Sequence, residues 1–226
     1  GLMSVTGERD NRPGGGPQKV GVPITDIMTG MYATISVLAA LARRDHAAPG
    51  APAGTHLGEH IDIGMLDVQV GFLANQAMNW LVGGVDPGRL GNRHPTVVPY
   101  KTFDVADGTI IIAIGNDGQF RAFCALMGVP QLAQDARFVT ASARLINRDA
   151  IEAEVQRLVA NEPGLPLIDR LAAAGVPAGP VNKVSEVFAD PFITARNVVH
   201  DFVRADGAHI PSVAFPGKLS ATPATM

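Results

Sequence analysis

The sequence predicts a protein of the α/β or α+β class, because segments of strand periodicity alternate with segments of helical periodicity along its 226 residues. The β-branched run "TIIIAIG" (109–115) is typical of a buried strand. The run "SARLINRDAIEAEVQRLVAN" (142–161) has the amphipathic spacing of a helix. Hydrophobic residues make up 46% of the chain and charged residues 17%, which indicates a globular protein.

The first part of the chain is predicted to be a loop followed by a long helix. The segment 8–19 is dense in Gly and Pro and has no apolar periodicity, so it is expected to be a loop. A helix is expected from about Asp26 to Arg44, with Thr25 as its N-cap. Its apolar residues recur at steps of three and four, as a buried face requires: Met28, Met31, Ile35, Leu38 and Leu41.

The next part is predicted to hold a second loop, a strand and a helix. Residues 43–56 form the loop, 60–63 the short strand and 66–82 the helix. Residues 86–100 have the composition of a long irregular loop, where we expect a domain boundary.

The remaining elements alternate between strands and helices. A strand and turn cover 101–108, a second strand 109–115, and a helix 117–128 ends at Gly128. After the helix 142–161, a further helix over "LIDRLAAAGVP" stops at 175–177, and a helical segment 184–197 breaks at Pro191. The tail 198–220 predicts two strands joined at Asp206-Gly207.

Charge and composition exclude several classes of function. A formal net charge of −3 and the lack of a basic run give no reason to expect nucleic acid or an anionic membrane as partner. The apolar run 27–42 is shorter than a bilayer span requires, and polar residues interrupt it. The single cysteine, Cys124, fits a reducing cytoplasm. The six histidines lack metal-site spacing, so no metal is expected, and no serine lies in a nucleophile elbow. Arginine and alanine usage favours a bacterial source.

Asp26 permits two interpretations. An acid in the first helical turn complements the helix macrodipole, and from position alone this interpretation is favoured. The alternative is a nucleophilic carboxylate, because Asp can attack an activated acyl group and divide one difficult transfer into two easier ones.

Two glycine-containing segments are candidates for ligand contact. In "AIGNDGQF" (113–120), Gly115 and Gly118 permit close backbone approach at a helix start, although an ordinary strand-to-helix turn with Asp117 as cap fits equally. The loop "GNRHPTVVPY" (91–100) gathers polar side chains between prolines, which is typical of functional loops. A single histidine in a loop, such as His94, is nevertheless more often a surface residue.

Taken together, these segments resemble the class III CoA-transferases, the CaiB/BaiF family that includes formyl-CoA transferase. The resemblance runs over almost the whole chain. It is carried, in family order, by "GLMSVTGE", "VGVPITDIMTGMYATISVLAAL", "GEHIDIGMLDVQV", "RLGNRHPTVVPY", "DGTIIIAIGNDGQF", "INRDAI" and "AGVPAGPVNKVSEVFADP".

The resemblance implies that Asp26 is the catalytic aspartate, which attacks an acyl-CoA thioester to give an aspartyl mixed anhydride and CoA thiolate. Coenzyme A is then a substrate, and no tightly bound cofactor is expected. Two segments would contact substrate or CoA and exclude water from the anhydride. They are the lid segment Gly91, Asn92, Arg93, His94 and Pro95, and the turn Gly115, Asn116, Asp117, Gly118 and Gln119.

The lid segment departs from formyl-CoA transferase, because "RHPTVVP" replaces consecutive glycines and carries two prolines. Succinyl-CoA or another larger donor is therefore expected instead of a formyl or oxalyl donor. Arg93 could pair with a substrate carboxylate; a simple surface charge is an equally good interpretation.

The resemblance also implies a fold and an assembly. Residues 1–85 would belong to a Rossmann-like, CoA-binding large domain, 86–185 to a smaller α+β domain and 186–226 to a segment returning to the large domain. Because "GLMSVTGE" reads like the middle of a protein, a truncated family member is expected. The expected assembly is an interlocked homodimer that acts on acyl-CoA and a small carboxylic acid.

Two alternatives stay open. An α-methylacyl-CoA racemase would use Asp26 or Asp117 with a histidine upstream of this sequence for proton transfer. A truncated remnant would be non-catalytic, and would only dimerise or bind acyl-CoA.

Overall fold

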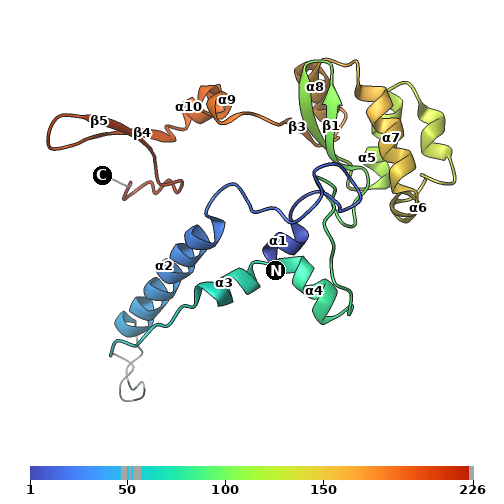
Figure 1. Cartoon of the computed structure of the whole chain (residues 1–226). Helices are drawn as coiled ribbons and strands as arrows, with labels where there is room; N and C mark the ends of the chain where they lie inside the picture. Colours follow the sequence, from blue (N-terminus) through green and yellow to red (C-terminus); the bar gives the residue numbers. More distant parts are fainter. Residues whose placement is uncertain (47–49, 51, 53–56, 224–226) are drawn as a thin grey trace. The chain divides into compact units, whose positions relative to one another are not determined.

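The computed structural model describes residues 1–46, 50, 52 and 57–223 (Figure 1). Helices and strands are mixed along the chain, which confirms the predicted α/β class. The chain divides into two compact units, Gly1–Lys101 and Thr102–Met226. The predicted loop 43–56 lies largely outside the described residues.

The first unit is helical and contains α1 (Leu2–Val5), α2 (Ile24–Asp45), α3 (Met65–Gly71) and α4 (Ala74–Leu81). Helix α2 begins two residues before Asp26, and its N-cap is Pro23. The prediction of Thr25 as N-cap is therefore wrong. Thr25 lies inside the first turn, and its hydroxyl donates a hydrogen bond to Gln69 Oε1 of α3, which joins the start of α2 to its neighbour.

The predicted buried face of α2 is not buried by the residues that the structure describes. Its large apolar side chains are exposed, including Met31, Ile35, Leu38 and Leu41. The periodicity correctly predicted an amphipathic helix, but periodicity does not say what covers the apolar face. With 22 residues, α2 is also long and apolar enough to cross a membrane, contrary to the estimate from the run 27–42. Length and composition are weak evidence of a span, since core helices of soluble proteins pass the same test.

Two further predictions in the first unit are wrong. Residues 60–63 form no strand, because a strand needs a hydrogen-bonded neighbour and none of the described strands pairs with them. The helix expected over 66–82 is two helices, α3 and α4, separated by Phe72 and Leu73. Ala74, at the start of α4, has a φ of +48°, a left-handed conformation that interrupts a continuous helix.

The second unit is built on a three-stranded sheet in the order β1-β2-β3. Strands β1 (Tyr100–Val105) and β2 (Gly108–Ala113) form the predicted hairpin, and β3 (Ala178–Pro180), which the sequence did not predict, pairs antiparallel with β2. In β2, Ile110 and Ile112 are buried whereas Ile111 between them is partly exposed, so one face of the strand supplies the core.

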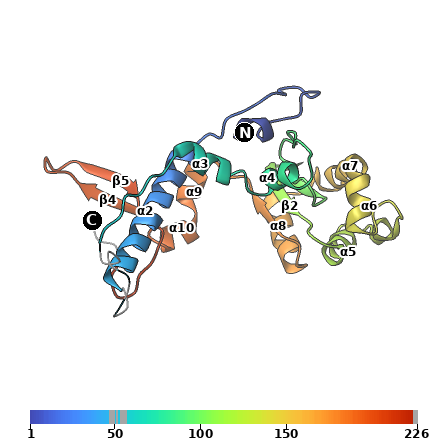
Figure 2. The ribbon, with the colours of Figure 1, turned by 90° about the horizontal axis from the view of Figure 1, so that it is seen from below.

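Helices complete the core of this unit. They are α5 (Asp117–Leu126), η1 (Pro130–Gln134), α6 (Ala141–Ile146), α7 (Arg148–Val159) and α8 (Gly164–Ala173). Helix α8 contacts β2 and β3, and α5, α6 and α7 lie together beside the sheet in both views (Figures 1 and 2). The helix predicted over 142–161 is two helices, since the turn at Asn147 separates α6 from α7. The fully buried side chains include Phe103, Phe120, Phe123, Ile151, Val155, Leu167 and Leu171.

The end of the chain follows the sequence prediction. Helices α9 (Val184–Ala189) and α10 (Pro191–Ala195) are separated at Pro191. Strands β4 (Val199–Val203) and β5 (His209–Val213) form an antiparallel hairpin. Gly207 has a φ of +83° in the connecting turn, a conformation that glycine adopts without steric cost.

Candidate functional site

Asp26 lies in the first turn of α2 with an exposed side chain. Within the described part of the chain its carboxylate makes no hydrogen bond and no ion pair. Asp26 is therefore a carboxylate with no structural partner in the first unit, whereas Thr25 beside it is engaged with Gln69.

The lid segment 91–95 is held at its beginning by the turn Thr6–Glu8 of the same unit. The Gly91 N–H donates to the Gly7 carbonyl over 2.9 Å. Gly91 has a φ of +63°, and a Cβ at this position would overlap the Glu8 carboxylate. The backbone conformation therefore favours glycine here, and an added Cβ would also displace the end of the Glu8 side chain. A polar cavity of about 430 Å³ lies beside this contact and is lined by Val5, Thr6, Gly7, Glu8, Gln18, Gly91 and Asn92.

Glu8 is the charged group beside this cavity, and the sequence analysis assigned it no role. The Arg9 N–H donates to Glu8 Oε1 over 2.8 Å and lowers the pKa of the Glu8 carboxyl. The charges of Arg9 and Arg93 lower it further, while desolvation opposes them. The positive charge of Arg93 thus interacts with the Glu8 carboxylate of the same chain.

His94 and Tyr100 close the far end of the lid segment. The His94 N–H donates to the Tyr100 carbonyl over 2.9 Å, and the two rings stack with centroids 5.0 Å apart and an interplanar angle of 8°. The Thr96 and Val97 N–H groups donate to His94 Nδ1 over 3.2 and 3.0 Å. The His94 side chain therefore accepts two backbone N–H groups of this loop, and the sequence analysis expected His94 in the site only through the family resemblance.

The second candidate segment, Gly115–Gln119, lies in the second unit between β2 and α5. Asn116 is the N-cap of α5, and its Oδ1 accepts from the Gln119 N–H over 2.9 Å. The Gln119 side chain returns and accepts from the Gly115 N–H over 2.7 Å. These reciprocal bonds satisfy two backbone donors, as a capping box does. Gly115 and Gly118 are both exposed, but the Gly115 N–H is already engaged by the Gln119 side chain.

Asp117 does not cap the helix; it pairs with a buried arginine. Arg144 of α6 is fully buried and lies 2.9 Å from Asp117 Oδ1. The same guanidinium donates to the Phe138 carbonyl over 2.9 Å and stacks over Phe120 at 4.6 Å. Arg144 was missed by sequence reasoning, because a pair between residues 27 positions apart leaves no local signal. Its contacts fix the turn 115–119 to the core of the second unit.

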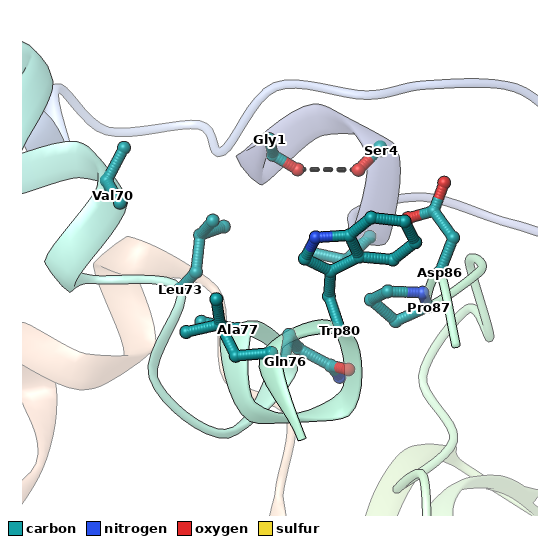
Figure 3. A pocket seen from close by; sticks show the side chains of 11 residues that line it. Gly1, Ser4, Val70, Leu73, Gln76, Ala77, Trp80, Asp86 and Pro87 are labelled. Carbon is teal, nitrogen blue, oxygen red and sulfur yellow. Dashed lines mark hydrogen bonds between the residues drawn. The ribbon is translucent and has the colours of Figure 1, made fainter. Parts of the chain in front are cut away.

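A separate hollow in the first unit contains no predicted site residue (Figure 3). It measures about 350 Å³, and Trp80 and Ala77 of α4 line it together with Leu73. In Figure 3 the Trp80 indole extends from α4 toward the turn of α1, where the Ser4 hydroxyl donates to the Gly1 carbonyl. This hollow is mostly apolar, unlike the polar cavity beside Glu8.

The comparisons with known proteins identify the fold first. The chain superposes on a CaiB/BaiF family protein from Brucella suis with a TM-score of 0.77 and 43% identity, covering 98% of this chain and 54% of that one. Rv3272 from Mycobacterium tuberculosis is similar with a TM-score of 0.79 and 25% identity over 95% of this chain and 54% of that one. The fold is therefore that of the CaiB/BaiF proteins.

The family follows from the sequence comparison. The sequence model of the family described as "CoA-transferase family III" matches residues 1–226, and the chain belongs to this family. It is 41% identical to a succinate–glutarate CoA-transferase of Agrobacterium fabrum over 99% of this chain and 53% of that protein. It is 34% identical to an acetyl-CoA:oxalate CoA-transferase of Acetobacter aceti over 93% of this chain and 51% of that protein. The chain thus spans about half the length of the relatives it matches.

Proposed function

We propose that the protein carrying this chain is an acyl-CoA:carboxylate CoA-transferase in which Asp26 is the residue that becomes acylated. The observation that carries the proposal is the geometry of Asp26: an exposed carboxylate in the first turn of α2 with no structural partner in the described chain. Relatives named succinate–glutarate and acetyl-CoA:oxalate CoA-transferase support the reaction class.

The reaction proceeds through anhydride and thioester steps at this carboxylate. Asp26 attacks the donor thioester carbonyl, the C–S bond breaks, and CoA leaves as thiolate. The thiolate then attacks the Asp26 carbonyl of the mixed anhydride and releases the donor acid. The acceptor carboxylate attacks the resulting aspartyl thioester, and the thiolate finally takes the acceptor acyl group from the second anhydride. Asp26 is regenerated, so no external oxidant, base or cofactor is consumed.

The substrate class that we propose is a dicarboxylic acid larger than oxalate, with succinyl-CoA or a similar ester as donor. The sequence of the lid supports this choice, because "RHPTVVP" stands in place of consecutive glycines, and Arg93 is proposed to bind the second carboxylate of the substrate through its guanidinium. The lid segment 91–95 and the turn 115–119 are proposed to exclude water from the anhydride. Residence in a bacterial cytoplasm, an interlocked homodimer and the absence of a bound cofactor belong to the same proposal.

The contacts of Asp117 disfavour the form of the racemase alternative in which Asp117 transfers the proton, and the form that uses Asp26 is left to the experiment. A residue that transfers a proton at the α-carbon needs a carboxyl that is free to change its charge. Asp117 instead pairs with a fully buried arginine, whose charge would be left uncompensated if Asp117 became protonated.

Trapping of the acylated aspartate tests the proposal. The protein is incubated with succinyl-CoA and hydroxylamine, digested with trypsin and analysed by mass spectrometry. A hydroxamate on Asp26, in the peptide that follows Lys19 and ends at Arg43, is the expected result. Asp67 is a matched control, because it is also an exposed acid in the first turn of a helix. Asp67→Asn should keep the label, and Asp26→Asn should lose it.

Three results would contradict the proposal. A label that survives Asp26→Asn, or that appears equally on Asp67, means that acylation is not specific to Asp26. Exchange of the α-proton of the acyl group into deuterium without any adduct means that the racemase alternative is correct. If neither an adduct nor exchange occurs, the remnant alternative is correct.

A further inference from the structure

The loop that contains His94 directs two of its backbone N–H groups to one side-chain atom. Residues 94–99 read His-Pro-Thr-Val-Val-Pro, so the prolines at 95 and 99 contribute no N–H and the segment belongs to no described helix or strand. Thr96 is exposed and Val97 is half-buried, and the N–H groups of both residues find their acceptor within the loop. Both of them donate to a single atom, Nδ1 of His94.

This geometry defines the proton position on the imidazole. A ring nitrogen that accepts hydrogen bonds carries no proton, and a neutral imidazole carries its one proton on the other nitrogen. His94 therefore holds its proton on Nε2. Protonation of Nδ1 would turn the acceptor of two hydrogen bonds into a donor facing two donors. The ring orientation is defined as well, because the ring stacks in parallel on Tyr100, whose carbonyl accepts the backbone N–H of His94.

We propose that His94 is a positioning residue for the lid segment 91–95, and not a proton-transfer residue: its Nδ1 atom shapes the loop by accepting the Thr96 and Val97 N–H groups. This inference rests on the proposed function for its catalytic consequence, since the lid acts in catalysis only if Asp26 is acylated. His94 acts through the backbone of residues 94–97, and the lid keeps its shape because two donors, one acceptor and one stacked ring meet at this point.

The substitution His94→Asn separates the hydrogen-bond acceptor of His94 from its ring. Oδ1 of Asn stands three bonds from Cα, as Nδ1 of His does, and Asn side chains accept N–H groups two residues ahead in Asx turns. His94→Asn therefore keeps the acceptor and loses the ring. His94→Phe keeps a ring that can stack on Tyr100 and loses the acceptor. Tyr100→Leu keeps the acceptor and loses the stack, and so measures the stack alone.

The steady-state kinetics of succinyl-CoA-dependent CoA transfer separate these roles. We expect His94→Asn to match Tyr100→Leu, and His94→Phe to lower kcat/KM about 10- to 100-fold below both, the effect of losing two hydrogen bonds. If His94 instead transferred a proton, Asn and Phe would be equally inactive, because neither side chain titrates near neutral pH. His94→Asn as impaired as His94→Phe would overturn the proposal.

A second measurement does not depend on activity. ¹⁵N NMR of the wild-type protein, with the His94 signals assigned by their absence in His94→Asn, should show an unprotonated Nδ1 and a protonated Nε2 at neutral pH. A proton on Nδ1 would overturn the proposal. If the wild-type protein forms no adduct on Asp26, the proposed function fails, but the NMR result still decides whether Nδ1 is the acceptor that shapes the loop.

Discussion

Gly91 and Gly84 form a matched pair that tests the contact between the lid segment and Glu8. Both glycines have a φ of +63°. A Cβ at Gly84 would meet nothing within 4 Å, whereas a Cβ at Gly91 would overlap the Glu8 carboxylate and lie 3.1 Å from its Cδ. Gly84→Ala therefore measures backbone strain alone. Gly91→Ala measures the same strain together with displacement of Glu8.

The structure sets the expected size of both effects. A left-handed conformation costs an alanine about 1–2 kcal/mol. In Gly91→Ala the Glu8 side chain must also move away from the Arg9 N–H, which it accepts over 2.8 Å. The Glu8 side chain is 39% exposed, so water compensates much of the lost bond and the additional cost is about 1 kcal/mol. We expect Gly84→Ala to lower the free energy of unfolding by about 1–2 kcal/mol and Gly91→Ala by about 2–3 kcal/mol.

Urea unfolding followed by tryptophan fluorescence is the appropriate assay. Trp80 is the only tryptophan of the chain and lies in the same unit as both glycines. The double variant Glu8→Ala/Gly91→Ala should recover the additional cost when it is compared with Glu8→Ala alone. Equal destabilisation by Gly84→Ala and Gly91→Ala, or no recovery in the double variant, would refute the reasoning that Glu8 occupies the space beside Gly91.

Two other predictions concern the second unit. Leu171→Ala removes a fully buried side chain of α8 and should lower the free energy of unfolding by about 2–5 kcal/mol. Leu165 lies on the same helix and is 65% exposed, so Leu165→Ala should change the free energy of unfolding by less than about 0.5 kcal/mol. Circular dichroism during urea unfolding measures both variants, and similar values would show that α8 does not pack as described. Burial raises the pKa of Cys124 to about 11, above the value of about 8.5 in an unfolded chain. The folded state thus binds the thiol proton more tightly, so this contribution to stability is complete below about pH 8.5 and is lost as the pH rises toward 11. The wild-type protein should lose more stability over this range than Cys124→Ala, and parallel pH profiles would contradict the burial of the thiol.

The sequence predicted best those elements whose signals are local. The hairpin of β1 and β2 has a β-branched run and a short turn, and α5 carries its own N-cap at Asn116. The division between α6 and α7 was not predictable. It depends on Asn147, whose Nδ2 donates to the carbonyls of Arg137 and Ala143. Arg137 lies outside α6, so the helix propensities of residues 142–161 do not indicate this contact.

The sequence could nominate residues for the candidate site but not their contacts. Asp26 was nominated because a first-turn acid and the family resemblance coincide at one position, and its role stays a prediction. Glu8 and Arg144 were missed, because their roles arise from Gly91 and Asp117, far away along the chain. Pairs of this kind are created by folding, and a single sequence shows each partner as an ordinary charged residue.

The apolar face of α2 has a practical consequence for every measurement named above. A helix that leaves Ile27, Met31, Ile35 and Leu38 in contact with water offers a surface on which molecules adhere to one another. Mass action then makes the apparent unfolding midpoint rise or fall with the amount of protein in the cuvette. Variants should therefore be compared at matched dilution, and a midpoint that drifts on dilution reports association at this face instead of a property of the substituted residue.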